Sequence, residues 1–377
     1  MKVALLTDGI YPYVLGGIQK HSYYLAKYLA RQKVYVDLYH TGPKEADVAD
    51  LNGFTGDELS YITTIFIPFP SLGKFPGHYI AEYYKYSTYL YSALISNEPV
   101  DFIYAQGFTG WKVAQEKKRS KMLPLMGVNF HGVEMFQQAP NFYVKLQHQL
   151  LRLPVKSISK NTDYIFSLGG KLNAIQHKLT DKPIIEIPIG IEKAWISSLD
   201  FSSKNKIRKL IFIGRYERRK GIEELLEVLK QLILTYEFEF VFIGPIPEEK
   251  KIYSDQIKYL GLIKDEEKVK AALQSADILV CPSYSEGMPT VILEAMACGL
   301  AVIATDVGAV NKLISTETGW LITQGSVLAL KESITSALTI SENELIRLKI
   351  NAQQLIIKNY TWNNIIERTI SVIKNLI

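Results

Sequence analysis

The sequence predicts an α/β protein of two domains, each built on a doubly wound parallel sheet. The chain has 377 residues, which is too long for one ordinary core and fits about two domains. Short β-branched runs alternate with helical patterns from start to finish, as in βαβ units. A stretch with a proline, serines and then charges, residues 188–206, separates two series of such runs. We therefore expect a first domain over 1–190 and a second over 191–360.

The expected strands are short and apolar, as strands covered by helices on both faces should be. In the first domain they are Val3–Thr7, Val34–Tyr39, Ile62–Ile67, Phe102–Ala105, Leu125–Phe130 and Tyr164–Leu168. In the second they are Leu210–Gly214, Phe240–Gly244, Ile257–Gly261, Asp277–Ser283 and Ala301–Thr305. A helical pattern over 361–377 follows the last unit of the second domain, and we expect this helix to cross back to the first domain.

The composition is that of a folded, enzyme-sized protein. Hydrophobic residues make up 47% and charged residues 21%, which is typical of globular proteins and excludes disorder and small disulfide scaffolds. Asp8 interrupts the apolar run at the N-terminus, so no secretory signal is predicted. No apolar stretch approaches the ~20 residues that cross a bilayer. Cys281 and Cys298 have no disulfide or metal-ligand spacing, so a reduced, cytoplasmic location is expected.

The positive charge is concentrated in the first half of the chain. Residues 112–182 carry 12 Lys and Arg against 4 Asp and Glu. Their basic residues include Lys117, Lys118, Arg119 and Lys121, and then Lys145, Arg152, Lys156 and Lys160 among leucines. The pattern fits a solvated helical surface or a face for an anionic partner, such as a membrane surface met through 112–160. No recognition motif for nucleic acid accompanies the charge, so nucleic acid is not an expected partner.

The most specific motif is E-G-M-P-T-V-I-L-E, from Glu286 to Glu294, which follows a predicted strand. Pro289 suits the first turn of a helix, where its missing N–H costs nothing. The first amides of that helix, at Thr290 and Val291, can bind a diphosphate. Both carboxylates are then expected to face a crevice at the carboxyl edge of the sheet. There Glu286 can accept hydrogen bonds from sugar hydroxyls and Glu294 from both hydroxyls of a ribose.

A second motif is G-R-Y-E-R-R-K-G, from Gly214 to Gly221, at the end of the first strand of the second domain. Gly214 allows a tight turn beside a ligand, and Arg215 and Lys220 supply two cations. They could neutralise a leaving diphosphate, a task that a metal ion performs elsewhere. No two aspartates in the chain are separated by one residue, so the Asp-x-Asp metal clamp is absent. We therefore expect no metal cofactor.

Two weaker signals lie in the first domain. Gly16 and Gly17 open a helix after the first strand, where a glycine pair can approach a phosphate. Their spacing is not that of the dinucleotide fingerprint. His131 follows the strand Leu125–Phe130 and is expected at a carboxyl edge that faces the Arg215 and Lys220 loop.

Together these motifs resemble the retaining glycosyltransferases of the GT-B fold, specifically glycosyltransferase family 4, over nearly the whole chain. The resemblance implies two Rossmann-like domains that face each other across a cleft, with an N-terminal acceptor domain and a C-terminal donor domain. It implies a nucleotide-sugar donor, a saccharide or lipid-linked acceptor, no metal, and a place in the cytoplasm or peripherally at the inner face of the cytoplasmic membrane.

The resemblance also implies a role for each matched position. Arg215 and Lys220 would hold the diphosphate, Glu286 the transferred sugar and Glu294 the ribose. The other donor-binding positions would be Gly16, Gly17, Gly214, Thr290, Val291 and the backbone at Leu262, which would meet the base. His131 would lie near the transferred sugar, so His131, Arg215, Lys220 and Glu286 are the expected catalytic residues. Met288 and Gly132-Val133-Glu134 depart from some relatives, which leaves the donor and acceptor open.

Two other functions remain open from the sequence. A nucleotide-sugar epimerase of the same architecture would share the donor site but needs an acid/base set for adding water at the anomeric carbon. A non-catalytic sugar- or nucleotide-binding subunit would keep the binding motifs without turnover.

Overall fold

The computed structural model of the chain describes residues 1–14, 16–43, 53–119, 122–197 and 207–377. Lys121 and residues 198–206 of the expected boundary lie outside the described residues. The chain forms two compact units. Unit 1 comprises Met1–Phe136, Leu146–Ile189 and Trp362–Ile377, and unit 2 comprises Gln137–Lys145 and Gly190–Thr361.

Unit 1 is built on a seven-stranded parallel sheet in the order β3-β2-β1-β4-β5-β6-β7. The strands are β1 (Lys2–Leu6), β2 (Tyr35–His40), β3 (Ile62–Phe66), β4 (Phe102–Gln106), β5 (Leu125–Asn129), β6 (Tyr164–Ser167) and β7 (Ile184–Glu186). All six strands expected from the sequence are present. β7 was not among the predicted strands, because three residues at a sheet edge carry too short a pattern to be recognised.

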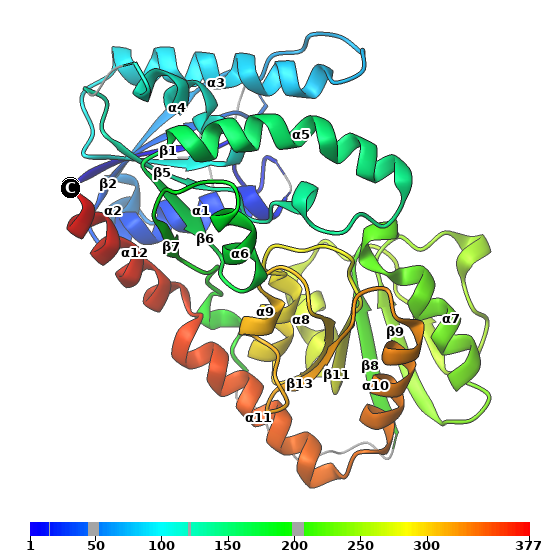
Figure 1. Cartoon of the computed structure of the whole chain (residues 1–377). Helices are drawn as coiled ribbons and strands as arrows, with labels where there is room; N and C mark the ends of the chain where they lie inside the picture. Colours follow the sequence, from blue (N-terminus) through cyan, green and yellow to red (C-terminus); the bar gives the residue numbers. More distant parts are fainter. Residues whose placement is uncertain (15, 44–52, 120–121, 198–206) are drawn as a thin grey trace. The chain divides into compact units, whose positions relative to one another are not determined.

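Helices cover both faces of this sheet (Figure 1). They are α1 (Gly17–Arg31), α2 (Gly56–Leu59), α3 (His78–Ser96), α4 (Trp111–Lys117), α5 (Phe142–Asn161), α6 (Lys171–His177) and α12 (Trp362–Leu376). The first four residues of α5, up to Lys145, are counted with unit 2. In β1, Val3 and Leu5 pack in one core with α1 and α12, whereas Ala4 and Leu6 pack in the other core with α3 and α4. This alternation follows from the two-residue period of a strand.

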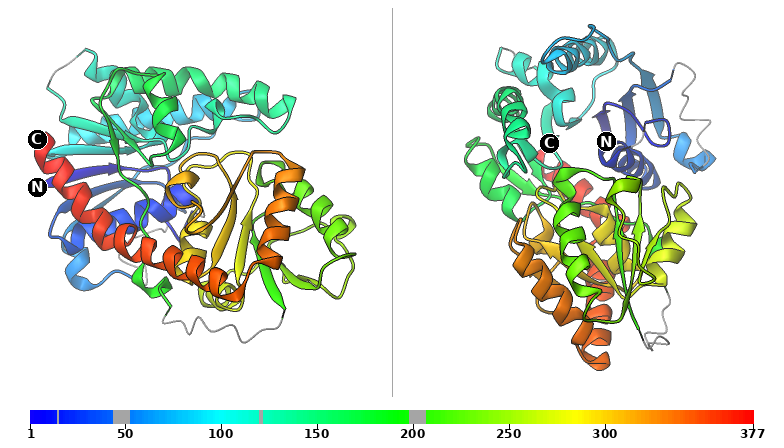
Figure 2. Two further views of the ribbon diagram at one scale, coloured as in Figure 1. Left: turned by 60° about the horizontal axis from the view of Figure 1, so that its bottom comes forward. Right: turned by 90° about the vertical axis from the view of Figure 1, so that its right-hand side faces the viewer.

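The last helix, α12, belongs to unit 1, as the sequence predicts, although α11 (Glu342–Asn359) before it belongs to unit 2 (Figure 2). Trp362 at its start is 1% exposed. Its ring lies 5.7 Å from the ring of Tyr28 and 5.4 Å from that of His21, both on α1. Burial of this indole therefore attaches the end of the chain to the first sheet.

Unit 2 contains a six-stranded parallel sheet in the order β10-β9-β8-β11-β12-β13. Its strands are β8 (Arg208–Ile213), β9 (Phe238–Ile243), β10 (Ile257–Tyr259), β11 (Ile278–Cys281), β12 (Ala301–Thr305) and β13 (Gly319–Ile322). The other helices are α7 (Ile222–Leu232), α8 (Glu266–Gln274), α9 (Thr290–Ala297) and α10 (Val327–Thr339). α7 and α10 share one core with the sheet, and α9 packs against α8 and α11. β13 was not among the predicted strands, because its Gly-Trp start is a weak strand signal.

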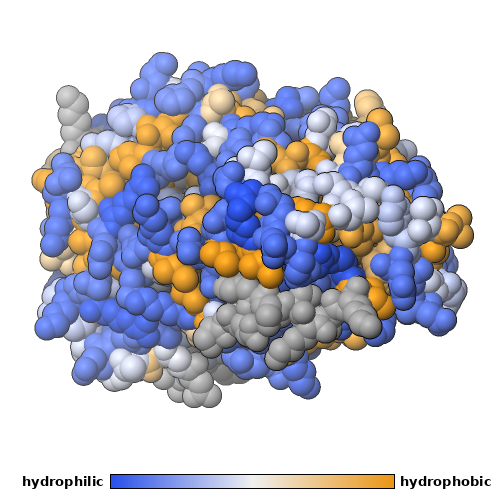
Figure 3. Space-filling view, turned by 90° about the horizontal axis from the view of Figure 1, so that it is seen from below, coloured by the Kyte–Doolittle hydropathy of each residue, from blue (hydrophilic) through white to orange (hydrophobic). Residues whose placement is uncertain are grey.

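Among the described residues, no helix is both long and apolar enough to span a bilayer. On the face drawn in Figure 3, apolar residues form separate patches among hydrophilic ones.

The first prediction concerns the attachment of α12. We expect Trp362→Ala to destabilise unit 1 by ~3–5 kcal/mol, because it removes a fully buried indole and leaves a cavity. Thermal unfolding followed by circular dichroism measures the loss. The control is Ile377→Ala, which removes an exposed apolar side chain from the same terminal segment. Equal unfolding temperatures for the two variants would contradict the proposed anchoring role of Trp362.

Candidate active site

The strand order of unit 2 reverses between β8 and β11, which are neighbours in the sheet although far apart in sequence. In open α/β sheets, ligands bind outside the carboxyl ends of the strands at such a reversal. The loop after β8 carries the motif from Gly214 to Gly221, and the loop after β11 carries the motif that begins at Glu286. The fold therefore brings the two most specific motifs of the sequence to the same edge.

Backbone contacts hold these two loops together. Gly221 has the left-handed conformation (φ 66°), and a Cβ atom there would lie 1.9 Å from the carbonyl oxygen of Pro282. The amide of Tyr284 donates a hydrogen bond of 2.7 Å to the carbonyl of Arg219. Only glycine fits at position 221, because any side chain would push the loops apart.

The two loops meet in an ion pair. Lys220 Nζ lies 2.6 Å from Glu286 Oε1, and Arg219 Nη1 lies 3.7 Å from Glu286 Oε2. The Glu286 side chain is only 8% exposed. A carboxylate so far removed from water is stable in its charged form only with partners, and here two cations from one loop supply them.

Arg215 differs from Lys220 in its surroundings. Its side chain is 72% exposed and pairs with Glu217 Oε1 at 2.9 Å. Glu217 also contacts Arg219 Nε through its other oxygen, at 3.2 Å. Alternating charges thus run from exposed Arg215 through Glu217 and Arg219, in the loop after β8, to buried Glu286 in the loop after β11. Glu217 and Arg219 were not among the predicted site residues, although both stand within the motif.

Further positions of unit 2 are predicted from the sequence to bind a donor. Pro289 precedes α9, whose first residues are Thr290 and Val291, and the first amides of a helix have no partner within it. Glu294 lies one turn further along α9 and is 9% exposed. Leu262 follows β10, where the carbonyl of Gly261 accepts a hydrogen bond from the amide of Gly244. The amide of Gly214 donates a hydrogen bond of 2.9 Å to the carbonyl of Ile243.

The glycine pair of unit 1 lies at the start of α1. Gly16 precedes the helix in an extended conformation, and a Cβ atom on Gly17 would meet nothing within 4 Å. Gln19, in the first turn, donates a hydrogen bond of 2.7 Å to Asp8 Oδ1, and Tyr83 donates one of 2.8 Å to Asp8 Oδ2. Burial raises the pKa of Asp8 above its usual value despite these donors.

His131 follows β5 in the left-handed conformation (φ 58°), and its amide bonds to Asn129 Oδ1. Its Nε2 lies 2.7 Å from Gln106 Oε1, and Gln106 Nε2 lies 3.0 Å from His21 Nδ1. An amide oxygen only accepts and an amide nitrogen only donates. With the amide oriented as in this structure, His131 carries its proton on Nε2 and presents Nδ1 as an acceptor.

Both histidines of this chain of hydrogen bonds are neutral. Burial lowers the pKa of His131 to about 3, and it lowers the pKa of His21 well below the usual value. The unfolded chain binds protons at these rings below pH ~6.5, whereas the folded chain does not. The folded state therefore loses stability as the pH falls from that value toward 3. His21 and Gln106 were not among the predicted site residues, because neither belongs to a recognisable motif.

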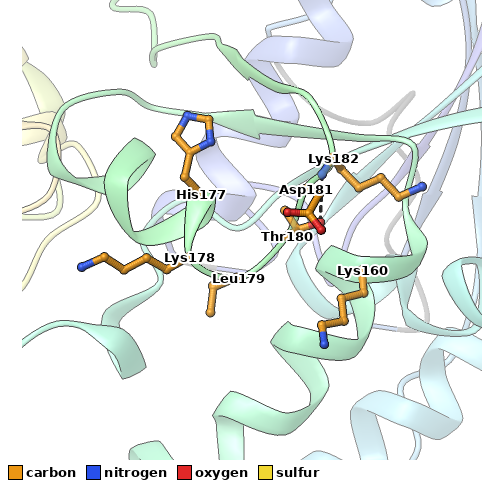
Figure 4. Close-up of a pocket in the computed structure, with 7 residues that line it drawn as sticks. All are labelled: Lys160, His177, Lys178, Leu179, Thr180, Asp181 and Lys182. Carbon is orange, nitrogen blue, oxygen red and sulfur yellow. Dashed lines mark hydrogen bonds between the residues drawn. The ribbon is translucent and has the colours of Figure 1, made fainter.

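A separate hollow of about 490 Å³ lies in unit 1 near the end of α5. It is lined by Lys160, His177, Lys178, Leu179, Thr180, Asp181 and Lys182 (Figure 4). Its residues precede β6 and β7, so it lies at the amino edge of the sheet, away from the carboxyl edge. The side chains of Lys178 and Lys182 point in opposite directions (Figure 4), and none of the predicted site residues is among those that line the hollow.

Within the described ranges, no group of three or more His, Cys, Asp and Glu side chains is arranged to hold a metal ion.

Comparison with curated proteins finds relatives that are glycosyltransferases by name. The chain is 34% identical over 181 residues to a protein of Bacillus subtilis described as "Putative teichuronic acid biosynthesis glycosyltransferase TuaC", covering 45% of this chain and 46% of TuaC. It is 29% identical over 191 residues to the phosphatidyl-myo-inositol mannosyltransferase of Mycobacterium leprae, covering 48% and 50%. The chain thus matches about half the length of each of these relatives.

Solved structures resemble the chain over its full length. Sucrose-phosphate synthase from Thermosynechococcus elongatus superposes with a TM-score of 0.82 at 20% identity, covering 100% of this chain and 98% of the other. Alr3699/HepE from Anabaena, in complex with UDP-glucose, superposes with a TM-score of 0.67 at 16% identity and complete coverage of both chains. These similarities establish the GT-B fold.

The family "Glycosyl transferases group 1" matches residues 197–374, which include both motifs of unit 2. That match coincides with the paired loops after β8 and β11, so unit 2 is similar to the group 1 glycosyltransferases, and the whole chain has the GT-B fold.

Proposed function

We propose that the chain is a retaining, metal-independent glycosyltransferase that moves a hexose-type sugar from a nucleotide-diphosphate donor to a glycan, glycolipid or similar acceptor. The observation that carries the proposal is the contact of Lys220 and Arg219 with buried Glu286 where the strand order reverses. A UDP-glucose complex of a protein with the same fold supports a nucleotide-sugar donor.

In this proposal unit 2 holds the donor. Lys220 and Arg215 meet the diphosphate, and the amides of Thr290 and Val291 bind its oxygens. Glu286 accepts hydrogen bonds from hydroxyls of the transferred sugar, and Glu294 accepts them from the ribose. The backbone at Leu262 meets the base, Gly214 lets the diphosphate approach β8, and in unit 1 Gly16 and Gly17 approach the phosphates.

Pre-organisation of Lys220 is the source of rate acceleration. Its ammonium group is already fixed by Glu286 before any donor binds, so little reorganisation is needed when negative charge grows on the leaving diphosphate. Arg215 is exposed and can swing toward the same oxygens from Glu217. Two such cations take the role that a divalent metal has in other transferases.

The proposed reaction needs no carboxylate nucleophile. The bond from the anomeric carbon to the diphosphate oxygen breaks, and the acceptor oxygen forms a bond to that carbon on the same face. The acceptor proton passes to an oxygen of the departing diphosphate. The side chains then act by orientation and charge stabilisation, and neutral His131 offers Nδ1 as a hydrogen-bond acceptor to a sugar hydroxyl.

An acceptor carried on a lipid is part of the proposal. One relative is by name a phosphatidyl-myo-inositol mannosyltransferase, which supports an acceptor at a membrane surface. We propose that the protein works in the cytoplasm and attaches peripherally to an anionic membrane, with no nucleic-acid partner.

The two competing functions are distinguished by products. Release of free epimerised nucleotide sugar would favour the epimerase. A purified chain that binds the donor but neither transfers nor hydrolyses it would be a binding subunit.

The second prediction tests the reaction class. We expect the product to keep the anomeric configuration of the donor and the rate to be unchanged by a chelator, because two fixed cations serve the diphosphate. Proton NMR of the first product, with and without EDTA, measures both. A product with inverted configuration would contradict the proposed mechanism. Loss of activity in EDTA would contradict metal independence.

The third prediction concerns the cations. We expect Lys220→Ala and Arg215→Ala each to lower turnover by ~10²–10³-fold, with a much smaller effect on binding of the free nucleoside. Steady-state kinetics and nucleoside titration separate the two. Lys230→Ala removes an exposed lysine from α7 and is the control. Since Lys220→Ala also leaves Glu286 with one partner fewer, its unfolding temperature is measured too; near-wild-type turnover in both variants would refute the assignment.

The fourth prediction concerns His131. We expect His131→Ala to lower turnover by about tenfold, the value of one hydrogen bond of ~1.5 kcal/mol, without unfolding the protein. His131→Asn is the backbone-matched variant, because asparagine tolerates the left-handed conformation. Neutral His131 does not titrate between pH 5 and 8, so the wild type and His131→Asn should have pH–rate profiles of the same shape. A pKa near 6.5 that disappears in His131→Asn would show acid/base catalysis instead.

A further inference from the structure

One side of α5 exposes an unusual number of large apolar residues. We call this set the α5 face; it consists of Phe142, Tyr143, Leu146, Leu150 and Leu153, whose exposed fractions range from 49 to 80%. Single exposed apolar residues are ordinary, but five on one helix are not.

The α5 face is continuous along the helix. At roughly 100° per residue, its five members fall within an arc of about 100°. The buried residues of α5, which are Pro154, Val155, Ile158 and Ser159, all lie outside this arc. Burial against the sheet therefore explains one apolar side of α5, and the α5 face needs another explanation.

Positive charge lies along one border of the α5 face. Lys145, Arg152 and Lys156 fall within roughly 80° of arc beside it, and the helix contains no Asp or Glu. Lys145 and Lys156 are exposed. Arg152 donates a hydrogen bond to the carbonyl of Met135, which fixes its position beside the helix. An apolar arc bordered by cations is the pattern of a helix that lies in a membrane interface.

The other basic stretch of unit 1 lacks this character. Lys117 Nζ contacts Asp163 at 2.9 Å and the carbonyl of Pro124 at 2.7 Å, so its charge is used inside the unit. Lys112 and Arg119 both pair with Glu116. Lys112, Lys117 and Arg119 therefore form ion pairs within unit 1. α5 remains the candidate surface for an anionic partner.

We propose that the α5 face docks on an anionic lipid bilayer, with its leucines and aromatic rings at the level of the headgroups and Lys145 and Lys156 against lipid phosphates. This inference rests on the proposed function, because it explains how the enzyme reaches a lipid-linked acceptor. A second copy of the chain fits less well: a two-fold interface through the α5 face would set basic borders beside each other without carboxylates. Because α5 has no acidic residues to repel lipid phosphates, its cations favour a surface that carries many negative charges.

The test is flotation of the full-length chain with vesicles of phosphatidylcholine alone or mixed with phosphatidylglycerol, at low and high salt. We expect binding to the anionic vesicles that weakens with salt, because the charges are screened within ~10 Å at 0.1 M. Leu146→Gln, Leu150→Gln and Leu153→Gln combined should abolish it, since glutamine keeps the helix and removes the apolar surface. The control combines Leu234→Gln and Leu328→Gln, two exposed leucines of unit 2.

The cations are tested separately. We expect Lys145→Gln with Lys156→Gln to weaken binding about 20- to 30-fold, at about fivefold per charge near an anionic leaflet. Lys178→Gln with Lys182→Gln removes the same charge elsewhere in unit 1 and should have little effect (Figure 4).

Equal binding to both kinds of vesicle, or flotation of the α5 variants like the wild type, would overturn the proposal. A change of oligomeric state in the leucine variant, measured by sedimentation without lipid, would assign the α5 face to contacts between copies instead. Stabilisation by a nucleotide sugar is measured on the same variants without vesicles. If a nucleotide sugar stabilises the protein but the wild type does not float with vesicles, membrane docking is wrong and the donor site stands. If the nucleotide sugar stabilises none of the proteins, the proposed function fails independently of membrane docking.

Discussion

The paired loops after β8 and β11 depend on the charge of Glu286. A carboxylate that is almost closed to water must be compensated, and both compensating cations, Lys220 and Arg219, come from the neighbouring strand's loop. The close approach that makes this possible exists because Gly221 has no side chain to meet the Pro282 carbonyl. One glycine and one buried acid thus fix the geometry on which the rest of the site in unit 2 is built.

In unit 1, the orientation of His131 depends on a series of contacts that reaches the C-terminal helix. His131 is oriented by Gln106, Gln106 by His21, and the ring of His21 lies against Trp362 on the terminal helix. The indole therefore supports the buried side of the hydrogen-bonded histidines as well as the core between α1 and α12. Stability and the protonation state of His131 rest on the same buried contacts, because burial keeps both rings neutral.

The distribution of charge in unit 1 shows why a count of basic residues is a poor guide to a binding surface. Lys117 is one of the residues that make the stretch before β5 strongly basic, yet it is bound to Asp163 and to backbone carbonyls. On α5, cations stand beside exposed leucines and aromatic rings, with no acid on the helix. The difference lies in what surrounds each charge after folding, which decides whether it can be offered to a partner.

The sequence by itself determined the strands that have a clear apolar pattern, the parallel α/β architecture and the resemblance of the two motifs to one family, since these depend on local periodicity and on spacing along the chain. It did not reveal β7 and β13, whose few residues form strands only because a neighbouring strand pairs with them. Nor did it reveal that Arg219 approaches Glu286, that Arg215 points to solvent, or that Gln106 connects His21 and His131. The contacts of the site join residues that are far apart in the sequence. Lys220 and Glu286, for example, are 66 positions apart, and only the order of strands in the folded sheet brings them together.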